Sequence, residues 1–228
     1  MHWSARVVLA AAVMLAPRMA LAADEPVPAP EPRVGQGWTL LGAQTAGDGA
    51  NVIAASAGFP GLSVTFLHGV TSIEDIGFRL AFHYSYEGLP TAIHPGLRGE
   101  AVARLRLLDT GRVSIGVRGG VGLFAYFTSA YTAPGISIPL GLAVGIPVGS
   151  AFSIATGVDV PLFVTFGPTG GLSAPILFDA GLEYFLSKAW QANAQVRLGP
   201  ALHVTGPFVP VGSPQIALEI TVGTAFKL

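Results

Sequence analysis

Strict alternation between apolar and polar or small residues runs through much of this chain. Between residues 75 and 86, every even position is apolar or aromatic and every odd position is small, polar or charged. The even row is Ile76, Phe78, Leu80, Phe82, Tyr84 and Tyr86, and the odd row is Asp75, Gly77, Arg79, Ala81, His83 and Ser85. Because successive side chains of a β-strand point to opposite faces, this alternation predicts a strand with one apolar face.

The same alternation recurs in later segments, and the charged residues keep to the row opposite the apolar one. The segments are 97–107, 113–127, 154–166, 176–184, 192–202 and 218–228. The charged row contains Arg79, Arg98, Glu100, Arg104, Arg106, Arg118, Asp159, Asp179, Glu183, Arg197 and Glu219. The charge-free stretch 119–158 is rich in Gly and Pro, which would break a membrane helix repeatedly and instead favours short strands joined by turns.

The composition points toward lipid. Hydrophobic residues make up 51% of the chain, charged residues only 11%, and the mean hydropathy is +0.59, whereas soluble domains contain about 25% charged residues. A net charge of −1 gives no electrostatic basis for binding nucleic acid. The absence of cysteine excludes disulfides and thiolate metal sites.

Two architectures alternate in this way, a water-soluble sandwich or barrel and a membrane barrel. In a soluble protein the polar rows would form a wetted exterior, but here they are small and glycine-rich. In a membrane barrel the apolar row meets lipid and the charged row lines a crowded lumen. We therefore predict an all-β fold, a closed antiparallel up-and-down transmembrane β-barrel of about ten strands, or alternatively about eight.

The N-terminus has the form of an export signal. His2 and Arg6 form a short polar, positive start, residues 7–16 are apolar, and Ala20 to Ala22 match the small-x-small pattern of a cleavage site. About ten apolar residues are too few for a helical membrane anchor. We expect a signal peptide at residues 1–22 cleaved near Ala22, a Pro- and Glu-rich periplasmic tail at 23–37, and the barrel at 38–228.

The spacing of the turns predicts which end of each strand faces the periplasm. An even strand number places both termini there. The turns on that side are then short, at 69–74, 108–112, 147–151 and 186–188, and the outer loops are 87–95, 128–135, 167–171 and 204–214. Trp38 to Thr45 is read as a short first strand, with Trp38 in an inner aromatic belt and Tyr84 and Tyr86 in an outer one.

The last residues resemble a known assembly signal. Thr221, Gly223, Phe226 and Leu228 follow the polar-x-Gly-x-x-hydrophobic-x-hydrophobic pattern, which is similar to the C-terminal signal of bacterial outer-membrane β-barrel proteins. Many such signals end on Phe or Trp, whereas this one ends on Leu228. The resemblance implies recognition by the barrel-assembly machinery and a location in the cell outer membrane. It extends to the superfamily and identifies no subfamily.

The candidates for chemistry are few. His68, His83, His94 and His203 show no metal-ligand spacing, so no metal or cofactor is expected. His83 with Ser85 is the best catalytic candidate, with Asp159 or Asp179 as a conceivable partner. A hydrogen-bonded lumen histidine is the preferred interpretation, and no catalytic residue is predicted.

The functional expectation is a non-enzymatic barrel, monomeric in outer-membrane lipid, with a lumen plugged by paired charges and a structural or surface-interaction role. At about eight strands side chains fill a barrel, and about ten leaves little more room. Two alternatives remain open, a narrow pore for small polar solutes and an outer-membrane hydrolase or acyltransferase.

Overall fold

The computed structural model describes residues 37–167, 170–205 and 215–228. The expected signal peptide at 1–22 and all but the last residue of the expected tail at 23–37 lie outside these residues. In the described part of the chain, no helix is long and apolar enough to span a membrane.

The described residues form antiparallel strands and one short 3-10 helix, η1 (Tyr86–Gly88). The strands are β1 (Asn51–Phe59), β2 (Gly61–Gly69), β3 (Glu74–His83), β4 (Gly96–Asp109), β5 (Ser114–Phe127), β6 (Thr132–Ile138), β7 (Leu140–Val148), β8 (Phe152–Asp159), β9 (Leu162–Thr165), β10 (Gly171–Pro175), β11 (Leu177–Phe185), β12 (Trp190–Thr205) and β13 (Gln215–Lys227). The all-β prediction is confirmed.

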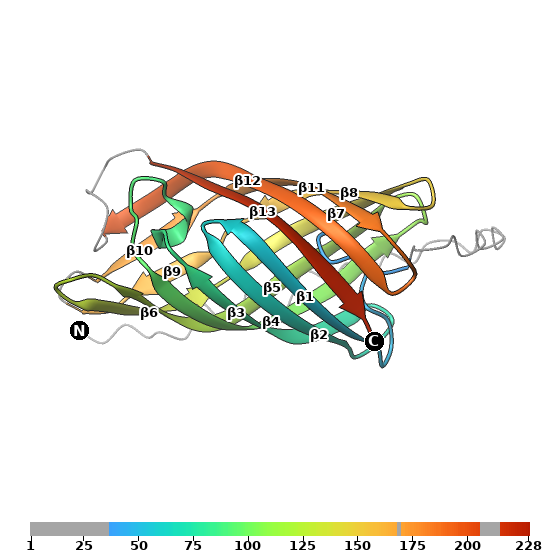
Figure 1. Ribbon diagram of the computed structural model, residues 1–228, viewed down its shortest axis with the longest axis horizontal. Coiled ribbons are helices and arrows are strands. Elements are labelled where there is room, and N and C mark those ends of the chain that lie inside the picture. The colour runs from blue at the N-terminus through green and yellow to red at the C-terminus, as the bar shows by residue number, and fades with distance from the viewer. Residues whose placement is uncertain (1–36, 168–169, 206–214) are drawn as a thin grey trace, which may run out of the picture. The chain divides into compact units, whose positions relative to one another are not determined.

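The sheet closes on itself because β1 pairs with both β2 and β13. Three strands of the ring are divided, into β6 and β7, β8 and β9, and β10 and β11, and each pair of pieces continues in one direction. Pro139 and Pro161 lie at two of these divisions, where a residue without an N–H cannot donate to the ladder. The ring thus passes through ten strands, each beside its neighbour in sequence (Figure 1). This agrees with the expectation of about ten and not with the alternative of eight.

The predicted alternation is confirmed, with its apolar row on the outside of the ring. In β3, the side chains of Ile76 and Leu80 are 53% and 54% exposed, while Asp75 and Ala81 are 0% and 6% exposed. Directly opposite residues of paired strands point to the same face. Since Arg79 lies opposite Glu100, the register brings charged rows together inside the ring.

The two ends of the ring differ in their connections. Asn51 and Leu228 exchange backbone hydrogen bonds at one end, here called the terminal end. The turns around residues 70–73, 110–113, 149–151 and 186–189 lie there. At the opposite end, here called the loop end, lie the twelve-residue connection 84–95, the four-residue connection 128–131, the single residue Pro60 between β1 and β2, and the connection between β9 and β10. Within the described residues, this grouping of the connections agrees with the sequence expectation.

Two sequence predictions about elements are wrong. Trp38 to Thr45 forms no strand, and the first strand begins at Asn51. Tyr86 does not belong to an outer aromatic belt, because β3 ends at His83 and Tyr86 is 1% exposed. The segment from Trp38 to Thr45 and the residues around Tyr86 instead turn into the ring, where interior residues bind them.

Candidate functional site

The inward faces of β3 and β4 carry a cluster of two arginines around one glutamate. Arg79 Nε donates a hydrogen bond to Glu100 Oε2 (2.8 Å), and Arg98 Nε lies 3.5 Å from Glu100 Oε1. Ser137 of β6 donates another hydrogen bond to Oε1 (2.9 Å). Glu100 is only 2% exposed, so these partners offset the large free-energy cost of burying its charge.

A second cluster lies on the strands β5, β8 and β11. Arg118 Nε donates to Asp159 Oδ1 (2.7 Å), and Arg118 Nη2 donates to Asp179 Oδ2 (2.5 Å). Gly141 separates Arg118 from Asp159 in the register, and a Cβ there would lie 2.0 Å from Asp159 Oδ1. Glycine at 141 therefore leaves the space that the ion pair occupies.

Arg197 extends this cluster to β13. Its Nη1 donates to Glu219 Oε2 (3.0 Å), and its Nε lies 3.3 Å from Asp159 Oδ2. The register that places Arg197 directly opposite Glu219 accounts for the first pair. A chain of alternating charges thus runs inside the ring from Asp179 to Glu219.

Interior charges near the terminal end bind the backbone of an irregular segment, residues 38–48, here called the N-terminal plug. Arg104 pairs with Asp75, and its Nη1 donates to the carbonyl oxygens of Thr39 (2.8 Å) and Leu40 (3.0 Å). Glu183 Oε1 accepts hydrogen bonds from the N–H groups of Leu40 (2.6 Å) and Leu41 (3.0 Å). The charged groups thus satisfy backbone groups that no strand partner would satisfy.

Apolar contacts complete the docking of the N-terminal plug. Trp38 packs edge-on against Phe185, with ring centroids 5.9 Å apart, and its Nε1 donates to Lys188 O (3.0 Å). Trp38 is 2% exposed, and Ala46 belongs to the same buried cluster. Trp38 therefore closes the interior instead of facing outward from a belt.

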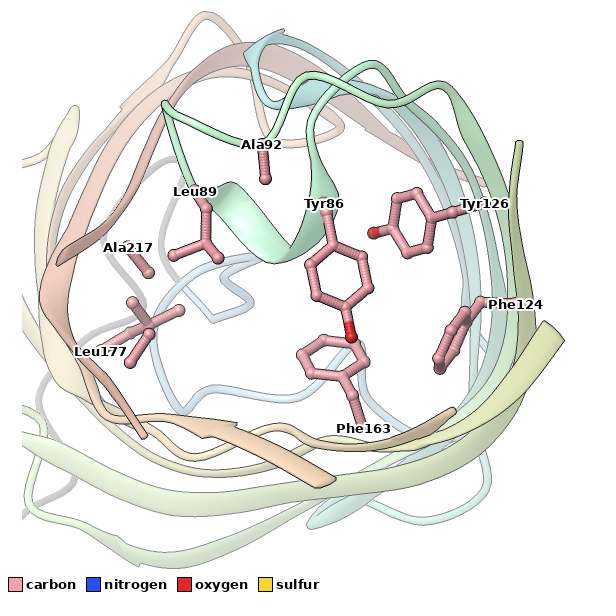
Figure 2. Close-up of a cluster of buried hydrophobic side chains, with 9 residues drawn as sticks. Tyr86, Leu89, Ala92, Phe124, Tyr126, Phe163, Leu177 and Ala217 are labelled. Carbon is pink, nitrogen blue, oxygen red and sulfur yellow. The ribbon is translucent and has the colours of Figure 1, made fainter. Parts of the chain in front are cut away.

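The loop end is closed by the connection between β3 and β4, residues 84–95, here called the loop plug. In Figure 2, Tyr86 and Leu89 of this loop point into the ring. They join a buried cluster with side chains of the surrounding strands, namely Phe124, Tyr126, Phe163, Leu177, Ala201 and Ala217. Tyr86 packs on Tyr126 with centroids 4.8 Å apart and shares a hydrogen bond with Thr165 (3.2 Å between oxygens).

His83 and Ser85 contact different groups. Arg98 Nη2 lies 3.3 Å from His83 Nε2, while Ser85 Oγ donates to Leu89 O (2.5 Å) within the loop plug. Among the described residues, no hydrogen bond joins His83 to Ser85 or to an aspartate. Both side chains are buried inside the ring, His83 at 7% and Ser85 at 0% exposure.

A cavity of about 200 Å³ lies within the ring of strands. Five arginines line it, and neutral polar side chains contribute to its wall. The arginines are Arg79, Arg98, Arg104, Arg118 and Arg197, and the neutral groups include Ser56, Ser63, Asn193, Gln195 and Thr221. The volume far exceeds the roughly 10–15 Å³ that one water molecule needs.

One predicted member of the charged network lies apart from it. Arg106 pairs with Asp109 (3.0 Å) and donates to Ser72 O (2.9 Å) at the terminal end. Asp75 was missing from the predicted network, although its place in the polar row of β3 is a signal that could have identified it. Its carboxylate also accepts a hydrogen bond from the Ala46 N–H (2.9 Å).

The C-terminal motif lies on β13 and the residue that follows it, Leu228, and its side chains divide between the two faces of the sheet. Phe226 and Leu228 are 48% and 65% exposed, while Thr221 lines the cavity. A Cβ at Gly223 would lie 2.5 Å from Ala55 O, so only glycine fits there without displacing β1.

Within the described residues, no group of three histidine or acidic side chains could hold a metal ion. In comparisons with known proteins, no family model matches the chain, and no curated protein matches it significantly.

Proposed function

We propose that this protein is an integral β-barrel of a bacterial outer membrane, with a lumen plugged from both ends and a non-enzymatic structural or surface-interaction role. The observation that carries the proposal is the inverted distribution of side chains, with apolar groups outside and charges inside. Water-soluble monomers rarely expose contiguous apolar patches larger than a few hundred Å². A lipid-facing wall requires such a surface.

Every strand of the ring contributes a large apolar side chain to the outer surface. One example from each is between 43% and 60% exposed, in the set Ile53, Val64, Leu80, Leu97, Val121, Leu142, Ile154, Phe178, Leu198 and Ile220. The carboxylates of Asp75, Glu100 and Glu183, in contrast, are at most 2% exposed. A closed ring also leaves no unpaired strand edge, which a hydrocarbon environment does not tolerate.

Aromatic side chains near both ends of the ring support the same assignment. Phe152 and Tyr184 pack together at the terminal end with ring centroids 4.8 Å apart, and Phe59 and Tyr84 at the loop end with centroids 5.7 Å apart. Aromatic residues are enriched at the two interfaces of a bilayer, where tyrosine hydroxyl groups reach water.

The two plugs favour a barrel that does not conduct over the alternative of an open pore. The N-terminal plug and the loop plug each bury aromatic side chains inside the ring, and ion pairs occupy the interior as well. The hydrolase alternative has less support, because His83 and Ser85 face the interior and make separate hydrogen bonds.

The test is localisation of the full-length protein in a Gram-negative host. We expect it in the outer-membrane fraction and expect unboiled samples to migrate differently from boiled ones on a gel. Recovery as a soluble periplasmic protein would refute the proposal. In planar bilayers the refolded protein should show no stable unitary conductance, and a steady conducting level would instead establish the pore.

A further inference from the structure

The loop plug places an acidic side chain deep inside the loop end of the ring. Glu87 is 3% exposed, and its carboxyl group forms no ion pair with a described residue. Its backbone has φ +50°, the left-handed region that a residue with a Cβ rarely adopts, and Gly88 follows with φ +72°. These two residues turn the chain back inside the ring.

Among the described residues, the groups around Glu87 compensate its charge only in part. Ser173 of β10 and the Tyr86 hydroxyl are hydrogen-bonding groups beside its carboxyl, and Arg98 of β4, which pairs with Glu100, is the cation whose charge acts on it. The Glu87 N–H donates to the Tyr126 hydroxyl (3.2 Å). The titratable or charged groups on the packed elements are Tyr86 in the loop, Arg98 on β4, Tyr126 on β5, His203 on β12 opposite Ser173, and Glu219 on β13 beside Gly88.

We propose that Glu87 is the titratable latch of the loop plug: the loop stays inside the ring while the Glu87 carboxyl is protonated, and ionisation of that carboxyl releases the loop. A neutral carboxylic acid fits among Tyr86, Tyr126 and Ser173, where a carboxylate has no ion-pair partner among the described residues. Ionisation favours the conformation in which Glu87 reaches water, because burying an unpaired charge is costly.

The direction of the pH dependence follows from burial. Burial raises the pKa of Glu87 to about 8 in the closed loop, whereas a solvated glutamate has a pKa of 4.5. Protonation of Glu87 therefore stabilises the closed loop over the open one to its full extent below pH 4.5. This stabilisation is lost as the pH rises from 4.5 through 8. Between those values each pH unit shifts the open-to-closed ratio by up to about tenfold.

Because the chain contains no cysteine, a single introduced cysteine can report how accessible its position is to a thiol reagent. The full chain, refolded in detergent micelles, carries either Ala92→Cys, at a buried position of the loop plug, or Thr91→Cys, at an exposed neighbouring position. Each is labelled with a water-soluble maleimide at pH 6.0 and pH 8.5. The ratio of the two labelling rates cancels the ordinary pH dependence of thiol reactivity.

We expect the labelling ratio of position 92 to position 91 to rise at least about tenfold between pH 6.0 and pH 8.5. Adding Glu87→Gln should make the ratio flat and low, whereas Glu74→Gln, at an exposed acid of β3, should leave the rise unchanged. A flat ratio in the parent, or the same rise with Glu87→Gln, overturns the proposal. Chymotrypsin cleavage within the loop provides a second readout free of the introduced cysteine. The ratio of the cleavage rate of the otherwise unsubstituted chain to that of the Glu87→Gln chain, measured at the same pH, should rise from pH 6.0 to pH 8.5. These micelle measurements do not depend on the proposed membrane location.

Discussion

At the residue scale, Arg104 joins two parts of the molecule that are distant in sequence. It pairs with Asp75 on the neighbouring strand and donates to two carbonyl oxygens of the N-terminal plug. Asp75 is 0% exposed, so it cannot recover solvation from water if its partner is lost. The sequence placed Arg104 in the charged row, but its plug contacts join residues about 65 positions apart and follow no local pattern.

The Arg104→Leu variant should lose about 3–5 kcal/mol of folding free energy, because it leaves a buried carboxylate without its ion pair. Urea unfolding from vesicles, followed by tryptophan fluorescence, measures the loss. The matched control is Arg106→Leu, whose partly exposed pair with Asp109 should contribute about 1 kcal/mol or less. Equal losses in the two variants would contradict this role for Arg104.

At the scale of elements, the two plugs are the segments that the sequence did not predict. Trp38 to Thr45 contains enough apolar residues to be read as a strand, yet its backbone hydrogen bonds go to interior side chains instead of a neighbouring strand. Tyr86 continues the alternation of β3 in the sequence, but β3 ends at His83, and the chain has already turned inward at Ser85 and Tyr86. Alternation of side chains gives no information about where backbone pairing stops.

The N-terminal plug should loosen when its acidic anchor is removed. Glu183→Leu leaves the Leu40 and Leu41 N–H groups without their acceptor, and hydrogen bonds to charged groups contribute about 1.5–3 kcal/mol each. Amide hydrogen exchange at residues 40–46 should therefore accelerate by more than about tenfold, with the strands unchanged. Glu183→Gln keeps an oxygen acceptor and should show a smaller acceleration. Unchanged exchange in the Leu variant would show that apolar contacts alone hold the plug.

At the scale of the whole molecule, the outer surface has the apolar character that a core normally has. A charge placed on that surface therefore distinguishes lipid from water. In a membrane barrel, arginine at the bilayer midplane costs about 2–4 kcal/mol, falling to about 0–1 near the interfaces. On a water-exposed surface the same substitution changes stability by only about 0.5 kcal/mol.

We expect Leu80→Arg to lower the folding free energy in lipid vesicles far more than Leu107→Arg. The two leucines are similarly exposed, 54% and 58%, but Leu107 lies close to the terminal end of β4. The measurement is the folding free energy in lipid vesicles by urea titration. If both variants fold as well as the parent, the apolar surface does not face lipid.

The sequence by itself determined the strands, their apolar face and the side on which the charges lie, because a period of two is a local property of extended backbone. It also placed the turns well enough to favour about ten strands. Only the tertiary structure decided what fills the ring. The Glu183 carboxylate accepts a hydrogen bond from the Leu40 N–H, 143 positions away in the sequence. Arg118 pairs with Asp179, which is 61 positions away. Such contacts depend on closure of the sheet and on the space left by glycines such as Gly141, which no local pattern encodes.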